Sequence, residues 1–218
     1  MKPKILQIRK GILESNDLAA QKLRKDFSQK NVLVINVVSS PGSGKTELLT
    51  ILIKKLIKKG LKVCAVVGDL ATDNDALRLK SSGASSYQIN TNGNCHLDAN
   101  MIEKSLKKVP WKSADILFIE NVGNLVCPAS YDLGENMRII LMSVTEGEDK
   151  PLKYPTMFNS ADICIVSKID LSEAVDFNKK LAIQNITSVN PNIKIFESSA
   201  KKGIGVDKII DYITSLIK

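Results

Sequence analysis

A short glycine-rich segment constrains this chain more than any other feature of its sequence. The segment Ser39–Thr46 reads SSPGSGKT; it follows an apolar run over residues 32–38 and precedes a helical pattern that begins at Leu48. A buried strand, a glycine-rich turn and a helix in this order form a loop that binds polyphosphates. Ser39 stands where the usual pattern has glycine, but the required strand–turn–helix context is present. The segment therefore predicts a nucleotide-binding fold.

The residues of this loop have separate expected roles. Its backbone N–H groups and the dipole of the following helix would face the phosphates. The Lys45 side chain would reach the β- and γ-phosphates, and the Thr46 hydroxyl would bind Mg²⁺. The phosphate cradle would consist of Pro41, Gly42, Ser43 and Gly44. The alternative is an ordinary glycine-containing turn that is followed by Lys-Thr only by chance.

The remaining pattern predicts an α/β fold with a mostly parallel β-sheet flanked by helices on both faces, because short apolar runs alternate with helical patterns. Residues 1–30 indicate an N-terminal amphipathic segment of one or two helices, and residues 31–218 a P-loop domain. A chain of 218 residues suits a single core. The expected strands cover residues 32–38, 63–67, 86–89, 116–119, 139–144, 163–166 and 193–196.

Charge and hydropathy argue against two classes of partner. The formal charge is +8, but the lysines are scattered and few aromatic residues accompany them, whereas a nucleic-acid platform combines charge with stacking residues. The sequence has no apolar run near the roughly 20 residues that cross a bilayer, and its start lacks the apolar stretch of a secretory signal. We expect a cytoplasmic protein that binds neither nucleic acid nor membrane.

Carboxylates follow two of the expected strands. Asp69 follows the strand near residues 63–67, and Glu120 and Gly123 follow the strand near residues 116–119. Ligands of parallel sheets bind at the carboxyl ends of the strands. We expect Asp69 and Glu120 to join the loop threonine around Mg²⁺ and the Gly123 N–H to face the γ-phosphate, so that these residues serve catalysis with Lys45 and Thr46. The alternative is that both carboxylates only cap helices or form turns.

Asn124 follows Gly123, at the place where many GTPases carry a glutamine that positions the attacking water. The sequence therefore predicts slow intrinsic hydrolysis.

Two motifs indicate that the bound base is guanine. The first, SKID, resembles the N-K-x-D guanine motif, with Ser167 in the asparagine position. Asp170 would accept two hydrogen bonds from guanine, and the Lys168 stem would cover the base plane. Adenine would leave this carboxylate poorly paired.

The second motif, ESSAK at residues 197–201, resembles the loop whose backbone amide contacts the guanine carbonyl. Together the two motifs favour GTP over ATP. The second motif contributes Ser199, Ala200 and Lys201 to the expected base site.

The four cysteines fall into two groups. Cys64 and Cys164 lie in apolar runs and are expected to act as small hydrophobic residues. Cys95 and Cys127 lie in polar segments, and Cys95 precedes His96, the single histidine. Thiolates and imidazole suit Zn²⁺ or Ni²⁺. The alternative is an unliganded cysteine beside a helix-capping histidine.

Three ligands leave a metal site incomplete. Water, or the same residues from a second protomer, could complete it. Cys127 lies four positions beyond Gly123, so movement at the γ-phosphate could shift a metal ligand directly.

The combination SSPGSGKT, GDL, CHLDA, ENVGNLVCP, LMSVTEGEDK, YPTMF and SKIDL resembles the HypB family, the nickel-incorporation GTPases of [NiFe]-hydrogenase maturation, from about Ile8 onward. The resemblance implies a SIMIBI-class P-loop GTPase that slowly converts GTP to GDP and phosphate. It also implies delivery of nickel to the hydrogenase large subunit, or regulation of its insertion.

The same resemblance implies GTP, Mg²⁺ and Ni²⁺ or Zn²⁺ as ligands, and a homodimer promoted by nucleotide, metal or both. The implied partners are a small zinc-containing nickel chaperone and the hydrogenase large-subunit precursor.

Three alternatives remain open. A urease-maturation GTPase would have a G-G-D-N-L pattern around Glu120 and a C-P-H pattern at the metal site, and this sequence has neither. A P-loop kinase of small molecules would need an arginine-bearing lid. A metal-binding scaffold would not hydrolyse nucleotide at all.

Overall fold

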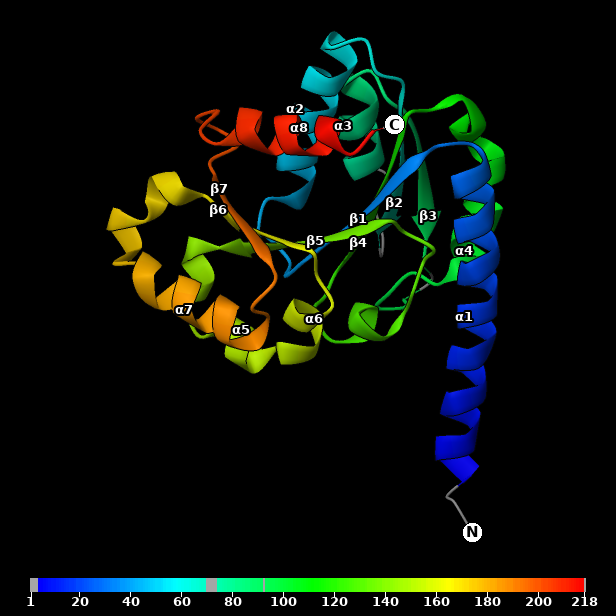
Figure 1. The fold of residues 1–218 in the computed structure, drawn as a ribbon, viewed down its shortest axis with the longest axis horizontal. Coiled ribbons are helices and arrows are strands. Elements are labelled where there is room, and N and C mark those ends of the chain that lie inside the picture. The colour runs from blue at the N-terminus through cyan, green and yellow to red at the C-terminus, as the bar shows by residue number, and fades with distance from the viewer. Residues whose placement is uncertain (1–3, 70–73, 92, 218) are drawn as a thin grey trace.

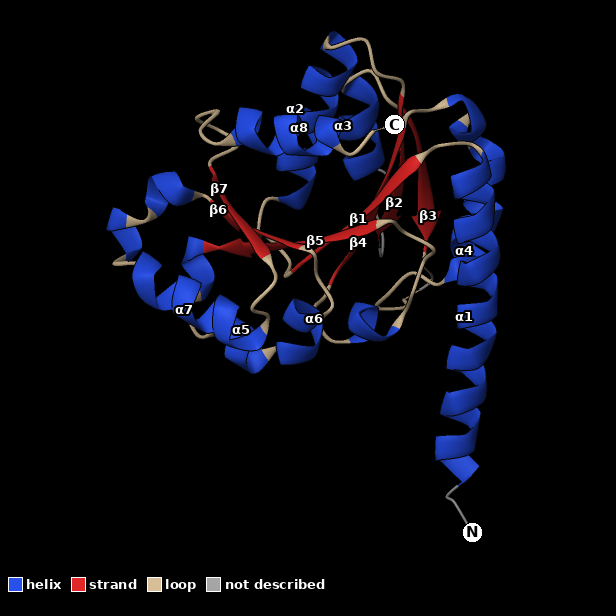
Figure 2. Cartoon of the chain, in the orientation of Figure 1, coloured by secondary structure: helices blue, strands red, loops and turns tan. Residues whose placement is uncertain are grey.

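A seven-stranded parallel sheet forms the centre of the molecule (Figure 2). The computed structural model describes residues 4–69, 74–91 and 93–217. The strand order is β3-β2-β4-β1-β5-β6-β7, and each pair of neighbouring strands is parallel. This confirms the expected sheet. The strands are β1 (Leu33–Ser39), β2 (Val63–Asp69), β3 (Ser85–Asn90), β4 (Ile116–Gly123), β5 (Met137–Ser143), β6 (Ile163–Ser167) and β7 (Lys194–Ser198).

Helices cover both faces of the sheet (Figure 1). One face carries α2, α3 and α8, whose apolar side chains share a core with the sheet. The other face carries α1 and α4 over one half of the sheet and α6 and α7 over the other half. The helices are α1 (Lys4–Gln29), α2 (Lys45–Lys58), α3 (Asn74–Ser81), α4 (Ala99–Ser105), α5 (Lys150–Lys153), α6 (Pro155–Asn159), α7 (Lys179–Val189) and α8 (Val206–Ser215).

The N-terminal segment is one helix, α1, which packs directly on the sheet domain. Its residues Ala20, Leu23 and Phe27 are buried in the same cluster as α4, and the Phe27 ring meets Trp111 edge-on at 5.3 Å between centroids. The first turns of α1 project beyond the rest of the molecule (Figure 1). The helix and the sheet domain therefore share a core.

A break in the chain direction precedes the helix α7. A 3₁₀ turn ends at Val175, and Asp176 adopts a left-handed conformation with φ 48°. The helix α7 then begins at Lys179, where the Asn178 side chain caps it by accepting a hydrogen bond from the Leu181 N–H. Because asparagine caps helices well, α7 starts directly after Asn178.

Two cysteines lie in the core, as expected. Cys64 and Cys164 are buried in β2 and β6. Burial raises the pKa of the Cys64 thiol to about 11, so its reactive thiolate form is scarce at neutral pH.

Among the described residues, none of the helices combines the length and apolarity needed to cross a membrane.

Candidate functional site

The phosphate loop joins β1 to α2 in the expected geometry. Gly42 and Gly44 have φ values of 74° and 91°, in the left-handed region where a side chain would be strained. Gly44 is the N-cap residue of α2, so the start of the helix faces the loop. The buried Ser39 hydroxyl donates to the Ser40 carbonyl at 2.7 Å. Serine at the usual glycine position is thus accommodated by a hydrogen bond inside the loop.

The side chains expected to bind the phosphates and Mg²⁺ meet beside this loop. The Thr46 hydroxyl donates to Glu120 Oε1 at 2.6 Å, and Lys45 Nζ lies 3.5 Å from the same oxygen. Glu120 is only 1% exposed. A buried carboxylate beside a hydroxyl offers the hard oxygen donors that Mg²⁺ prefers. Asp69 ends β2 at the same sheet edge, but its side chain lies outside the described part of the structure.

Gly123 lies directly against the phosphate loop. A Cβ atom built on Gly123 would stand 3.1 Å from Pro41 Cα and 3.2 Å from Pro41 N. The register is irregular just before this position: Val37 pairs with Glu120 and Ser39 with Gly123, so β4 has one residue more than β1 in this stretch. The end of β4 therefore touches the backbone that would hold the phosphates.

A pocket of about 390 Å³ brings the residues of the two guanine motifs together beside Gly44. Ser167 Oγ donates to the Ser43 carbonyl at 2.8 Å, and Lys168 Nζ donates to the Gly42 carbonyl at 2.7 Å. Both side chains thereby tie the pocket to the phosphate loop. The pocket contains all six residues expected at the base: Ser167, Lys168, Asp170, Ser199, Ala200 and Lys201.

Ser198 also lines this pocket. Its Oγ is buried and has no hydrogen-bond partner among the described residues. In the sheet it pairs with Ser167, whose short side chain bonds the phosphate loop instead. Buried hydroxyls almost always have a partner, so this atom fits a pocket that receives a polar ligand.

Glu146, which follows β5, is a site residue that the sequence did not reveal. Its Oε1 accepts hydrogen bonds from Ser43 Oγ at 2.6 Å and from the Ser143 N–H at 3.0 Å, and its Oε2 lies 3.0 Å from Lys150 Nζ. Burial alone would raise its pKa, but hydrogen bonds from Ser43, Ser40, the Ser143 N–H and Lys150 outweigh burial and lower it. Glu146 thus anchors the phosphate loop to the end of β5. The S-x-x-E spacing of a capping box was the available signal.

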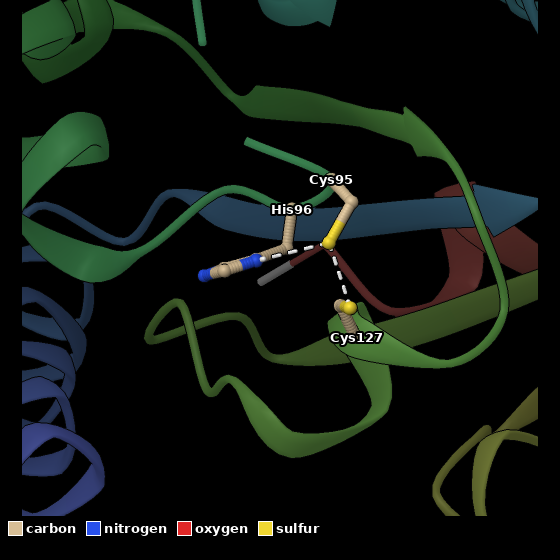
Figure 3. A group of neighbouring side chains, drawn as sticks. All are labelled: Cys95, His96 and Cys127. Atoms are coloured by element: carbon tan, nitrogen blue, oxygen red, sulfur yellow. Dashed lines mark hydrogen bonds between the residues drawn. The ribbon is translucent and has the colours of Figure 1, made fainter. Parts of the chain in front are cut away.

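The candidate metal residues gather in one cluster (Figure 3). Single donor atoms of Cys95, His96 and Cys127 all lie within 4.8 Å of one another. The two Sγ atoms are 2.7 Å apart, and His96 Nδ1 is 3.7 Å from Cys95 Sγ. Two thiols and an imidazole form a donor set suited to Zn²⁺ or Ni²⁺. The side chain that caps α4 is Asp98, so the alternative of a helix-capping histidine is wrong.

A tyrosine and burial shape the histidine of this cluster. The Tyr131 ring stacks on the His96 ring with 3.9 Å between centroids. Burial lowers the pKa of His96, and the nearby Asp98 opposes this shift only in part. The imidazole is therefore held in place and neutral at physiological pH, which is the form that binds metals.

Asn16 of α1 connects the two chain segments that carry the cluster. Its Oδ1 accepts a hydrogen bond from the Ala99 N–H, and its Nδ2 donates to the Asp132 carbonyl, each at 2.9 Å. Ala99 follows the Cys95–His96 segment, and Asp132 follows the Cys127 segment. The N-terminal helix is thus part of the support of the cluster.

Comparison with known proteins places the chain among maturation factors. A family model described as "CobW/HypB/UreG, nucleotide-binding domain" matches residues 33–197. The hydrogenase maturation factor HypB of Rhizobium leguminosarum bv. viciae is 48% identical over 204 residues, which cover 94% of this chain and 68% of that protein.

Two solved structures are similar along most of the chain. The hydrogenase maturation factor HypB from Archaeoglobus fulgidus has a TM-score of 0.87 at 36% identity, covering 94% of this chain and 100% of the other. HypB from Helicobacter pylori, solved in complex with nickel, has a TM-score of 0.86 at 41% identity, covering 92% and 94%. These matches confirm the expected P-loop fold.

Proposed function

The chain belongs to the HypB family of hydrogenase maturation factors, and from that premise we propose that it is a slow GTPase that delivers nickel to a [NiFe]-hydrogenase large subunit or regulates its insertion. A P-loop nucleotide-binding domain and a maturation role follow from the family. The choice of GTP, the hydrolysis and the nickel site of this chain form the proposal.

The observation that carries the proposal is that one short segment reaches both candidate sites. Glu120 accepts the Thr46 hydroxyl beside the phosphate loop. Seven positions later, Cys127 lies beside Cys95 in the thiol–imidazole cluster. A change at the nucleotide can therefore reach the cluster without a long path.

The nucleotide part of the proposal assigns roles around the phosphate loop. Lys45 and the loop backbone would hold the phosphates. Thr46, Glu120 and Asp69 would hold Mg²⁺, which when bound neutralises charge on the β- and γ-phosphates. The Gly123 N–H would face the γ-phosphate. Asp170, which lines the pocket, would accept two hydrogen bonds from guanine.

The metal part treats nickel as cargo. Cys95, His96 and Cys127 would bind Ni²⁺ or Zn²⁺, and a second protomer would complete the site in a homodimer promoted by nucleotide or metal. A small zinc-containing nickel chaperone and the hydrogenase large-subunit precursor are the proposed partners.

Nucleotide hydrolysis tests the first half of the proposal. Phosphate release is measured with GTP and with ATP for the wild type, Lys45→Ala and Lys58→Ala, the last at an exposed position near the end of α2. We expect the wild type to release phosphate from GTP only. Lys45→Ala should lose nucleotide binding and therefore release no phosphate, whereas Lys58→Ala should behave as the wild type. Equal use of ATP would contradict the proposal and favour a kinase-like or unspecific NTPase.

Metal titration tests the second half. Cys127→Ala should lose stoichiometric binding of Ni²⁺ while its GTP affinity stays near that of the wild type. Ser130→Ala, in the same 3₁₀ helix and exposed, is the matched control. An unchanged nickel titration in Cys127→Ala would reject the site.

A further inference from the structure

Residues at the end of β4 contact both the nucleotide loop and the segments that carry the cysteine cluster. On the nucleotide side, Glu120 accepts the Thr46 hydroxyl, and Gly123 leaves no room for a side chain against Pro41. The two asparagines of this stretch, Asn121 and Asn124, bond instead to the segment that contains Cys95 and His96. Neighbouring backbone positions therefore serve different sites.

Asn121 is the fixed member of the pair. It is buried, and its Oδ1 accepts the N–H of Val122 at 2.9 Å and that of Leu97 at 3.3 Å. Leu97 directly follows His96. Asn121 thus attaches the histidine segment to the body of the sheet.

Asn124 joins the two cysteine segments. Its Nδ2 donates to the Cys95 carbonyl at 3.0 Å, and its Oδ1 accepts the Val126 N–H at 2.9 Å. Val126 immediately precedes Cys127, and Asn124 immediately follows Gly123. At this position the side chain is therefore engaged with the cluster rather than directed at a water beside the phosphates.

We propose that Asn124 is the positioning residue that couples the nucleotide state to the spacing of the two thiols. This inference rests on the proposed function, in which Gly123 responds to the γ-phosphate. Any shift of Gly123 moves the Asn124 backbone, and its two hydrogen bonds carry that shift to the segments of Cys95 and Cys127 together. Metal affinity depends on how surrounding groups orient the ligands, so each nucleotide state has its own nickel affinity.

The variants separate the two hydrogen bonds of Asn124. Asn124→Asp keeps an oxygen that accepts the Val126 N–H but lacks the donor to the Cys95 carbonyl. Asn124→Ser is neutral and can form a local turn with the following backbone, but its side chain is too short for Cys95. Asn94→Ser, at an exposed position directly before Cys95, is the control.

The measurement is the nickel dissociation constant of the full chain with Mg²⁺, once with GDP and once with a non-hydrolysable GTP analogue. The ratio of the two constants in the wild type should lie in the usual range for coupled sites, roughly 5- to 150-fold. In Asn124→Ser and Asn124→Asp it should fall below about twofold, whereas Asn94→Ser should keep the wild-type ratio. Because coupling is reciprocal, nickel should change the affinity for the GTP analogue by the same factor.

Two results would overturn the inference. If both Asn124 variants fold and keep the wild-type ratio, coupling runs through other contacts, and the proposed function is unaffected. If the wild type itself shows no dependence on nucleotide, both the inference and nucleotide-controlled delivery are wrong. Should one substitution prevent folding, the other gives the same measurement.

Discussion

The Sγ atoms of Cys95 and Cys127 lie 2.7 Å apart, although the residues are 32 positions apart in the chain. Cys95 follows β3 and Cys127 follows β4, and β2 lies between these strands in the sheet. The two loops therefore extend toward each other across the end of β2. This closeness makes the thiols a pair with different chemistry from the other cysteines.

The first prediction concerns thiol reactivity. In the native protein at pH 8, a small thiol reagent should modify Cys95 and Cys127, which it can reach, and leave Cys64 and Cys164 unmodified. The hydrogen bond with Cys127 raises the pKa of Cys95, so exposure rather than an acidic thiol makes this pair reactive. Cys64 and Cys164 are buried, and burial raises the pKa of both thiols, so little thiolate forms. Peptide mass spectrometry would identify the modified residues. Stoichiometric Ni²⁺ should protect the reactive pair, and unprotected modification would argue against metal binding there.

The second prediction concerns the base. Asp170→Asn should weaken GTP relative to xanthosine triphosphate, because an amide can donate to the xanthine 2-oxo group, whereas the carboxylate accepts from guanine. A hydrogen bond to a charged group is worth about 1.5–3 kcal/mol, so the preference should shift at least about tenfold. Competition binding measures it. Asp176→Asn, a nearby exchange outside the pocket lining, should leave the preference unchanged.

The third prediction concerns pH. The pKa of Glu146 is lower in the folded protein than its usual value. At a pH between the folded and the unfolded pKa, the unfolded chain therefore binds more protons than the folded one. Its stabilising effect is complete above the unfolded pKa of about 4.3 and is lost as the pH falls through the folded pKa. Urea unfolding at pH 7 and pH 3.5 should therefore show a smaller loss of stability for Glu146→Gln than for the wild type.

The same substitution should cost about 1–3 kcal/mol at pH 7, because it weakens hydrogen bonds to a largely buried carboxylate. Glu173→Gln, at an exposed position, is the control. An identical pH dependence of Glu146→Gln and the wild type would show that the contacts of Glu146 do not stabilise the fold.

The sheet could be predicted from the sequence because its inner strands are short apolar runs buried on both faces, whereas the edge strands β3 and β7 are partly exposed. Each expected strand is present, with ends that differ by a few residues. The largest difference is β4, which continues through Glu120 and Asn121 to Gly123. Polar residues usually end a strand pattern, but here both side chains are buried and hydrogen-bonded to distant parts of the chain.

The candidate site was predictable where chemistry follows a local motif. The phosphate loop, the guanine motifs and the cysteine–histidine pair each occupy a few consecutive residues. Their supports could not be found in this way, because Glu146, Tyr131 and Asn16 act through contacts with residues distant in the chain. A buried asparagine in an amphipathic helix gives no sign in the sequence of the two backbone groups that it binds.

The fourth prediction concerns this asparagine, because it tests whether α1 supports the metal cluster or only the fold. Asn16 is 3% exposed and satisfies the Ala99 N–H and the Asp132 carbonyl. Asn16→Ala leaves a buried N–H and a partly buried carbonyl without this partner, so the free energy of unfolding should fall by about 1–4 kcal/mol. Ser15→Ala, at the neighbouring exposed position, should change it by less than about 0.5 kcal/mol.

Metal affinity separates the two roles. Ala99 and Asp132 anchor the segments of His96 and Cys127, so Asn16→Ala should weaken nickel binding by more than it weakens GTP binding, measured at a temperature where the variant remains folded. Asn16→Asp keeps the oxygen that accepts the Ala99 N–H and loses only the donor to Asp132, and it should show an intermediate nickel affinity. If nickel and GTP affinities both stay at wild-type values while stability falls, α1 supports only the fold.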